Sequence, residues 1–211
     1  MSSQRLPGKV LLPVLGEPMI FRQIERIERC ESLDALVVAT SIDSTDDELA
    51  AACEIRNISC YRGGLNDVLR RFAQLVSNHE ADTIVRLTAD CPLADPAIID
   101  AVVRYYENGD YDYVCNCSPP TFPDGLDVEV VRRSCLLQAE EKADLASERE
   151  HVTAYIRNRP DTYRIGNYFS DHDRSGWRWT VDEFADLEFI RRIYAALYPE
   201  NMLFTTDNII R

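Results

Sequence analysis

The sequence predicts an α/β protein in which helices cover both faces of a mixed, mostly parallel β-sheet. Two observations predict this three-layer α/β/α arrangement. Short runs rich in β-branched residues alternate with longer segments in which apolar residues recur at helical spacing. The alternation continues through more than half of the 211 residues, without a repeat or a linker. We therefore expect a single domain that spans residues 1–211.

The first half of the chain supplies the clearest elements. Isoleucines recur at helical spacing after Pro18, a residue suited to the first turn of a helix. A capping box from Thr45 to Glu48 predicts the start of a second helix, and Asn66 is placed to cap a third. The expected helices are 18–31, 45–56, 66–75 and 96–107, and the expected strands are 35–40, 58–61, 83–88 and 111–115.

The second half, from Pro119 onward, is more irregular and resembles an α+β arrangement. A proline-rich loop leads into a strand on which Asp127 and Glu129 share one face, because side chains alternate along a strand. The expected strands here are 125–131, 163–169 and 177–181, and the expected helices are 133–143, 148–158 and 183–197.

Composition excludes several classes of protein. The chain has 23 basic and 36 acidic side chains, and this balance argues against a general nucleic-acid binder, whose affinity depends on clustered Lys and Arg. No apolar run approaches the roughly 18 residues that a membrane-spanning helix needs, and the N-terminus lacks a secretory signal. We expect a cytoplasmic protein without membrane contact. The seven scattered cysteines fit reduced thiols better than a disulfide framework.

Residues 2–9, SSQRLPGK, concentrate positive charge and hydrogen-bond donors in an otherwise acidic chain. Gly8 allows the backbone to approach a ligand, Arg5 offers a planar fork of donors and Lys9 a mobile point charge. These properties suit a bound phosphate, and Ser3 is a further candidate contact. The stretch is not a Walker A sequence, however, and a basic N-terminal tail explains it equally well.

Asp90 and Asp182 each follow a predicted strand. Asp90 lies in TADCPL before a proline turn, and Asp182 lies in RWTVDE before a helix. Ligands of open α/β sheets bind at the carboxyl ends of strands. Two carboxylates placed there are the ligands that Mg²⁺ prefers when it also takes substrate phosphates. A turn cap at Asp90 and a helix cap at Asp182 are the alternatives.

Other polar residues are candidates for contacts with a substrate. His151 lies in REHVT at the expected start of a helix, where a substrate contact and a helix-end hydrogen bond are equally good explanations. Asp127 and Glu129 are placed to contact sugar hydroxyls, and Arg62 lies in an expected Arg-Gly-Gly turn. The Asp-X-Asp triplets at 110–112 and 171–173 look like metal-binding motifs, but the first precedes a strand and the second lies in a polar loop.

Taken together, the motifs RLPGK, TADCPL, FPDGLDVEV, REHVT and RWTVDE closely resemble the cytidylyltransferase family. The likeness spans nearly the whole chain and is closest to the branch that acts in spore-coat polysaccharide biosynthesis. The resemblance to these enzymes, some of which make CMP-activated sugar acids, implies a nucleotide-diphospho-sugar transferase-type fold. It also implies that CTP and a sugar or sugar acid are the substrates, that pyrophosphate is released, and that the chain can form a homodimer.

The same resemblance implies roles for individual residues. Arg5 and Lys9 are expected to hold the triphosphate, while Asp90 and Asp182 hold Mg²⁺, so that Lys9, Arg5 and Asp90 form the catalytic group. Asp127 and His151 match motifs of the spore-coat branch. Family members also have an apolar strand directly before the segment that matches this N-terminus. The resemblance therefore implies either a start codon placed too far downstream or a truncated, inactive copy.

Two other functions stay open at this level. A glycosyltransferase that uses a nucleotide-sugar has the same fold and metal but cleaves between sugar and phosphate. A non-catalytic nucleotide-binding protein is the other alternative, since the first strand is absent. Release of pyrophosphate from CTP separates both from a cytidylyltransferase. A sugar 1-phosphate would attack through an oxygen that is already anionic. If the acceptor atom is a hydroxyl oxygen, a general base or a metal-bound hydroxide is needed, and the sequence identifies none.

Overall fold

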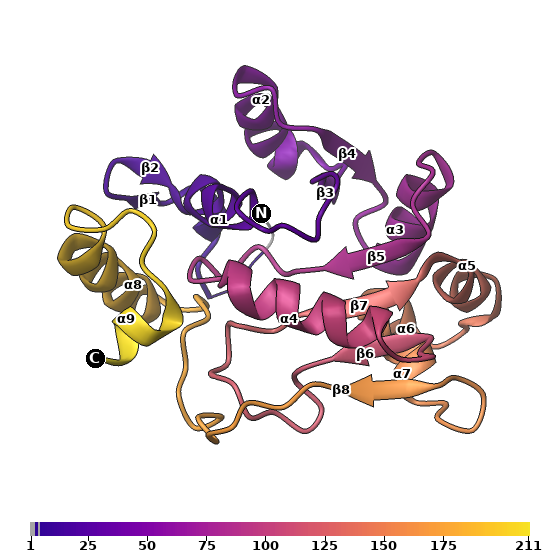
Figure 1. Ribbon diagram of the computed structural model, residues 1–211. Coiled ribbons are helices and arrows are strands. Elements are labelled where there is room, and N and C mark those ends of the chain that lie inside the picture. The colour runs from indigo at the N-terminus through magenta and orange to yellow at the C-terminus, as the bar shows by residue number, and fades with distance from the viewer. Residues whose placement is uncertain (1–2, 4) are drawn as a thin grey trace.

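The computed structural model describes residue 3 and residues 5–211 of the chain (Figure 1). The strands are β1 (Pro13–Val14), β2 (Glu17–Pro18), β3 (Val38–Ser41), β4 (Cys60–Gly63), β5 (Thr83–Arg86), β6 (Tyr113–Cys115), β7 (Glu129–Arg132) and β8 (Ile165–Asn167). The helices are η1 (Lys9–Leu11), α1 (Met19–Ile27), η2 (Ser44–Asp46), α2 (Asp47–Ile55), α3 (Val68–Ser77), α4 (Pro96–Glu107), α5 (Arg133–Lys142), α6 (Ala146–Glu150), α7 (Ala154–Arg157), α8 (Phe184–Leu197) and α9 (Thr206–Ile210).

A four-stranded sheet in the order β5-β7-β6-β8 lies at the centre of the fold. β7 pairs antiparallel with both β5 and β6, whereas β6 pairs parallel with β8. β5, β6 and β8 therefore run in one direction, and β7 opposes them. The predicted α/β class and the mixed, mostly parallel sheet are confirmed.

Helices cover both faces of this sheet because its side chains alternate between two apolar clusters. On β6, Tyr113 and Cys115 pack with residues of α3, α5 and α7, whereas Val114 packs on the opposite face with residues of α4. On β7, Val131 and Val130 divide in the same way. Each such valine is buried, which stabilises the fold by about 1.5–3 kcal/mol relative to an exposed one. In Figure 1, α4 crosses in front of the sheet.

β3 and β4 form a separate parallel pair. Within the described residues, β3 pairs only with β4 and β5 only with β7, so each has one edge without a strand partner. The end of β3 is held by Asp46, whose carboxylate accepts hydrogen bonds from the Thr40 hydroxyl at 2.7 Å and from the Ser41 amide at 2.9 Å. These bonds fix the connection from β3 to α2.

Helix positions agree with the sequence better than helix caps do. α4 has the predicted bounds, and Asp95 caps it by accepting from a first-turn amide at 2.9 Å. The capping box at Thr45 is wrong, because Asp43 accepts from the Thr45 amide and a 3-10 turn precedes α2. The cap at Asn66 is also wrong, since the neighbouring Asp67 takes that role. Several short polar residues precede each helix. Their order in the sequence alone does not show which side chain accepts from the first-turn amides.

The second half departs further from prediction. β7 begins at Glu129, so Asp127 lies in the loop before the strand. The expected helix 148–158 is broken into α6 and α7 at Val152, which has a φ of 47°. Residues 177–181 form no strand and make one isolated bridge, between Asp124 and Arg178. The β1-β2 hairpin and α9 were not predicted. Both are short, and hydrophobic periodicity needs more residues than they contain.

The described residues also bear on the predictions about disulfides and membrane spans. All seven cysteines are free thiols, as the sequence predicts. Among the helices of the described residues, none combines the length and the apolar character needed to cross a membrane.

Candidate active site

The turn before η1 orients the side chain of Lys9 toward the interior of the protein. Gly8 has a φ of 68°, a left-handed conformation that costs glycine little and other residues more. Backbone hydrogen bonds from Lys9 to Leu6 and from Leu11 to Gly8 close the turn at 3.2 and 2.9 Å. The Ser3 hydroxyl accepts from the Leu6 amide at 3.3 Å, so Ser3 supports the turn. Ser2 and Gln4 of the predicted phosphate-binding stretch lie outside the described residues.

Asp90 lies in the turn that follows β5. Its carbonyl oxygen accepts from the Val181 amide at 2.8 Å, and this bond joins the turn to the segment before α8. Its side chain is 28% exposed, and one carboxylate oxygen accepts from the Cys91 thiol at 3.6 Å. The carboxylate therefore faces a partly open site and is not consumed by a turn cap.

Asp182 precedes α8 but does not cap it. Glu183 is the N-cap residue and forms a capping box with Asp186. The Asp186 carboxylate also accepts from the Asp182 amide at 2.9 Å, which fixes the backbone on which the Asp182 side chain stands. The helix-cap alternative for Asp182 is therefore wrong, and its carboxylate is available for other contacts.

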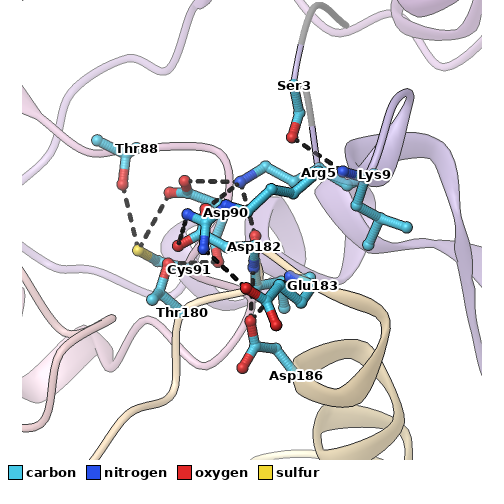
Figure 2. A network of polar contacts seen from close by, with 12 residues as sticks. Ser3, Arg5, Lys9, Thr88, Asp90, Cys91, Thr180, Asp182, Glu183 and Asp186 are labelled. Atoms are coloured by element: carbon cyan, nitrogen blue, oxygen red, sulfur yellow. Dashed lines mark hydrogen bonds and ion pairs between the residues drawn. The ribbon is translucent and has the colours of Figure 1, made fainter.

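The structure brings Lys9, Asp90 and Asp182 together (Figure 2). The Lys9 ammonium group donates to Asp90 Oδ2 and to Asp182 Oδ1, both at 3.0 Å, and to the Val181 carbonyl oxygen at 2.6 Å. The other oxygen of Asp182 contacts Arg178 at 2.7 Å and Arg5 at 3.2 Å. We call Arg5, Lys9, Asp90, Arg178 and Asp182 the open charge cluster.

The cations of the open charge cluster keep both carboxyls ionised. Burial by itself would raise the pKa of Asp90, but a hydrogen bond from Thr88 and the charge of Lys9 outweigh it, so the pKa is lowered. Burial also opposes ionisation of Asp182, and there Lys9 and Arg178 lower the pKa. Both groups are therefore carboxylates at neutral pH, the form that a metal ion or a cationic side chain needs.

The donor set of the cluster fits a divalent cation that keeps other ligands. A single cationic group already lies 3.0 Å from one oxygen of each aspartate, so the two carboxylates converge on one point. In residue 3 and residues 5–211, no group of three or more His, Cys, Asp or Glu side chains is arranged to hold a metal. An ion bound here would take its remaining ligands from water and substrate phosphates, as Mg²⁺ commonly does.

Three other predicted residues, all among the described ones, form no hydrogen bond or ion pair with the open charge cluster. Arg62 lies on β4 and donates to the Ser41 carbonyl oxygen at 2.8 Å, so the expected turn there is wrong. His151 is the C-cap residue of α6 and does not open a helix. Asp127 forms no hydrogen bond or ion pair with a described residue, although it lies near enough to Asp90 for their charges to interact.

Acidic side chains of both Asp-X-Asp triplets make local contacts. Asp112 accepts from Arg164 at 3.0 Å, and Asp110 contacts the same guanidinium group. In the second triplet, Asp173 accepts from the Ser175 hydroxyl at 2.7 Å within an exposed loop. Asp110, Asp112 and Asp173 are thus engaged by neighbouring side chains.

Sequence reasoning missed Arg178 and Asp186, which organise the site from one side. Arg178 contacts Asp182 at 2.7 Å and Asp186 at 3.1 Å. Arg178 and Asp182 are four residues apart, and this spacing of opposite charges could have predicted their ion pair. The expectation of a strand at 177–181 hid it, because residues four apart in a strand share a face but lie far from each other.

A family model described as cytidylyltransferase matches residues 1–202. The spore coat polysaccharide biosynthesis protein SpsF of Bacillus subtilis is 34% identical over 204 residues, which cover 92% of this chain and 82% of that protein. A 3-deoxy-manno-octulosonate cytidylyltransferase of Chlamydia trachomatis is 32% identical over 130 residues, which cover 59% of this chain and 49% of that protein.

The solved structures include a close match to the whole described fold. The structure of a cytidylyltransferase from Leptospira borgpetersenii superposes with a TM-score of 0.93 at 29% identity, covering 100% of this chain and 88% of that one. The likeness therefore extends over both the regular first half and the irregular second half.

Proposed function

Because the chain belongs to the cytidylyltransferase family, we propose that it transfers CMP from CTP to a sugar or sugar acid in polysaccharide biosynthesis, with release of pyrophosphate. The observation that carries the proposal is the open charge cluster. In a chain with a net charge of −13, basic residues from the N-terminal turn meet two carboxylates at one place. A nucleoside triphosphate with a divalent cation complements both signs of charge.

The residues of the open charge cluster bind different parts of the substrate complex. Asp90 and Asp182 would hold Mg²⁺, which neutralises charge on phosphate oxygens when it is bound. Lys9 and Arg5 bind and orient the triphosphate, because both reach the site from the turn around Gly8. Arg178 keeps Asp182 in position and stays paired with Asp186. Catalysis then depends mainly on positioning and charge neutralisation.

The acceptor oxygen attacks the α-phosphorus of CTP, the bond to the bridging oxygen of pyrophosphate breaks, and pyrophosphate leaves. Where the acceptor is a hydroxyl, its proton passes to water as the new bond forms, and where it is a phosphate oxygen there is no proton to remove. We favour a sugar acid as acceptor because the second relative above acts on one by its name. Asp127 is the residue that we assign to the sugar hydroxyls, since it is half-buried and carries no other polar partner among the described residues.

A pyrophosphate-release screen tests the proposal. The full chain is incubated with each nucleoside triphosphate, a panel of sugar 1-phosphates and sugar acids, and Mg²⁺, Mn²⁺ or EDTA. We expect release with CTP and a sugar acid, and none with EDTA. Cleavage of a nucleotide-sugar without use of CTP would contradict the proposal and indicate a glycosyltransferase. Binding of CTP without turnover of any acceptor would indicate a non-catalytic protein.

A further inference from the structure

Lys9 cannot bind the two carboxylates and a triphosphate at the same time. An ammonium group has three N–H donors. Those of Lys9 are taken by Asp90, Asp182 and the Val181 carbonyl oxygen, at 3.0, 3.0 and 2.6 Å. The side chain is only 13% exposed. In this arrangement Lys9 has no donor left for a phosphate, and the same two carboxylates have their converging oxygens occupied.

We propose that Lys9 is a built-in cation that holds the carboxylate pair in the nucleotide-free protein and excludes a divalent ion until a triphosphate draws it away. The inference rests on the proposed function, because it concerns the metal assigned there. It adds an order of binding: the metal enters with the nucleotide or after it, and not before.

Competition for the same oxygens supports this order. Mg²⁺ lies about 2.0–2.1 Å from its oxygen ligands. An ammonium group 3.0 Å from Asp90 Oδ2 and Asp182 Oδ1 fills the space where the two carboxylates converge. Two cations placed there would repel each other across a few ångströms, and the site is too sheltered for water to screen them fully. Lys9 therefore has to leave before the ion can enter.

Only the side chain of Lys9 needs to move. Its backbone is fixed in the turn by hydrogen bonds on both sides, to Leu6 and from Leu12, at 3.2 and 3.1 Å. A lysine side chain is a compact charge on a flexible four-carbon stem, which suits it for moving between two anionic partners. Asp182 keeps Arg178 and Arg5 after Lys9 leaves. Asp90 keeps no cation among the described residues and is then open to the metal.

Metal binding without nucleotide gives the first test. The probe is Mn²⁺ alone, measured by electron paramagnetic resonance with the full chain. Lys9→Met should bind Mn²⁺ at least tenfold tighter than the wild type, since a charge-assisted contact no longer competes for the two carboxylates. Lys9→Arg, which keeps the charge, should bind as weakly as the wild type. Lys142→Met is the matched control, because Lys142 is the only other lysine and is exposed on α5.

A second measurement follows Lys9 in the wild-type protein and so does not depend on the folding of a variant. With ¹³C label at lysine Cε, the NMR spectrum contains two lysine signals, and Lys142 serves as the internal reference. Addition of CTP in EDTA should shift the Lys9 signal, whereas Mg²⁺ without nucleotide should not. A Lys9 signal that Mg²⁺ alone shifts as far as CTP does would overturn the proposal.

The outcomes separate this inference from the function on which it rests. If wild type and Lys9→Met bind Mn²⁺ equally well without nucleotide, the role of Lys9 is overturned while the metal site stands. If neither binds Mn²⁺ even in the presence of CTP, the metal assignment itself fails. If Lys9→Met gains affinity and Asp90→Asn removes that gain, both stand.

Discussion

Glu129 and the pair Asp90–Asp182 are acidic groups that basic side chains neutralise at different depths in the molecule. Glu129 is 5% exposed and accepts from the Tyr113 hydroxyl at 2.7 Å. It also contacts Arg86, which lies opposite it in the β5-β7 register, and the Thr153 hydroxyl. We call Glu129 with these three partners the closed network. The Asp90 and Asp182 side chains are 28% and 23% exposed.

The two regions differ in whether their carboxylates can change partners. In the closed network three partners surround one buried carboxylate, and two of them come from neighbouring strands of the same sheet. In the open charge cluster the cations come from the N-terminal turn and from the segment before α8. A buried pair costs stability when it is broken, whereas a partly exposed one can change partners. The closed network thus stabilises the sheet, and the open charge cluster is suited to ligands.

The largest expected effect is on the closed network. Glu129→Gln should lower the free energy of unfolding by about 3 kcal/mol, because Arg86 is left in a sheltered place without its counter-charge. Urea denaturation at pH 7 measures the change. Glu188→Gln is the control, since Glu188 forms an exposed pair with Arg191 and its loss should cost no more than about 0.5 kcal/mol. Equal midpoints for the two variants would remove the distinction between the clusters.

Substitutions in the open charge cluster should lower activity much more than stability. Asp90→Asn and Asp182→Asn each remove a charge-assisted contact worth about 1.5–3 kcal/mol, so the Mg²⁺-dependent rate of pyrophosphate release should fall at least tenfold. The free energy of unfolding should change much less. Asp171→Asn, in the second Asp-X-Asp triplet, should retain full activity. If both variants at the cluster keep the wild-type rate, Asp90 and Asp182 are not the metal ligands.

The sequence predicts the two regions to different extents. The strand and turn that place Asp90 follow from a β-branched run that ends in an acid before a proline, and such a signal is local. The three-way contact of Lys9 depends on residues 81 and 173 positions away, and no local pattern reports it. Glu129 was expected to share a strand face with Asp127 and to contact sugar hydroxyls. Its true partners come from other strands and from α6-α7, which periodicity does not place.

Asp127 lies between the two regions and offers a third comparison, because it is partly buried and forms no ion pair with a described residue. Burial, with the charges of Asp124, Glu129 and Asp90, raises the pKa of the Asp127 carboxyl to about 6. An acid with a raised pKa favours the folded state only while it is protonated. Its contribution is complete below the unfolded pKa of about 3.9 and is lost as the pH rises through 6.

Asp127→Asn should therefore stabilise the protein at pH 7.5 by about 1–2 kcal/mol, after allowance for partial exposure, and have almost no effect at pH 4. Melting temperatures of the wild type and the variant from pH 4 to 8 measure the difference. Asp144→Asn, at an exposed position after α5, is the control. A stabilisation by Asp127→Asn that does not depend on pH would show that the carboxylate is already solvated or paired.

The smallest effect is expected at Arg5, the most exposed cation of the open charge cluster. Its side chain is 57% exposed and contacts Asp182 at 3.2 Å and Glu183 at 3.0 Å. Arg5→Met should weaken CTP about fivefold, equivalent to about 1 kcal/mol, and leave cytidine unchanged because cytidine has no phosphate. Isothermal titration calorimetry with both ligands measures the ratio. Arg56→Met is the matched control, since Arg56 forms an exposed pair with Glu17 elsewhere on the surface.

Salt sharpens the test of Arg5. Exposed charges interact over a screening length of about 10 Å at 0.1 M salt and about 3 Å at 1 M. The advantage of wild type over Arg5→Met should therefore shrink as salt rises. A contact made at the sheltered Lys9 should persist, because that side chain is 13% exposed. An equal loss of affinity for CTP and cytidine would place Arg5 outside the phosphate site, and the triphosphate would then have to be held by Lys9 and the metal alone.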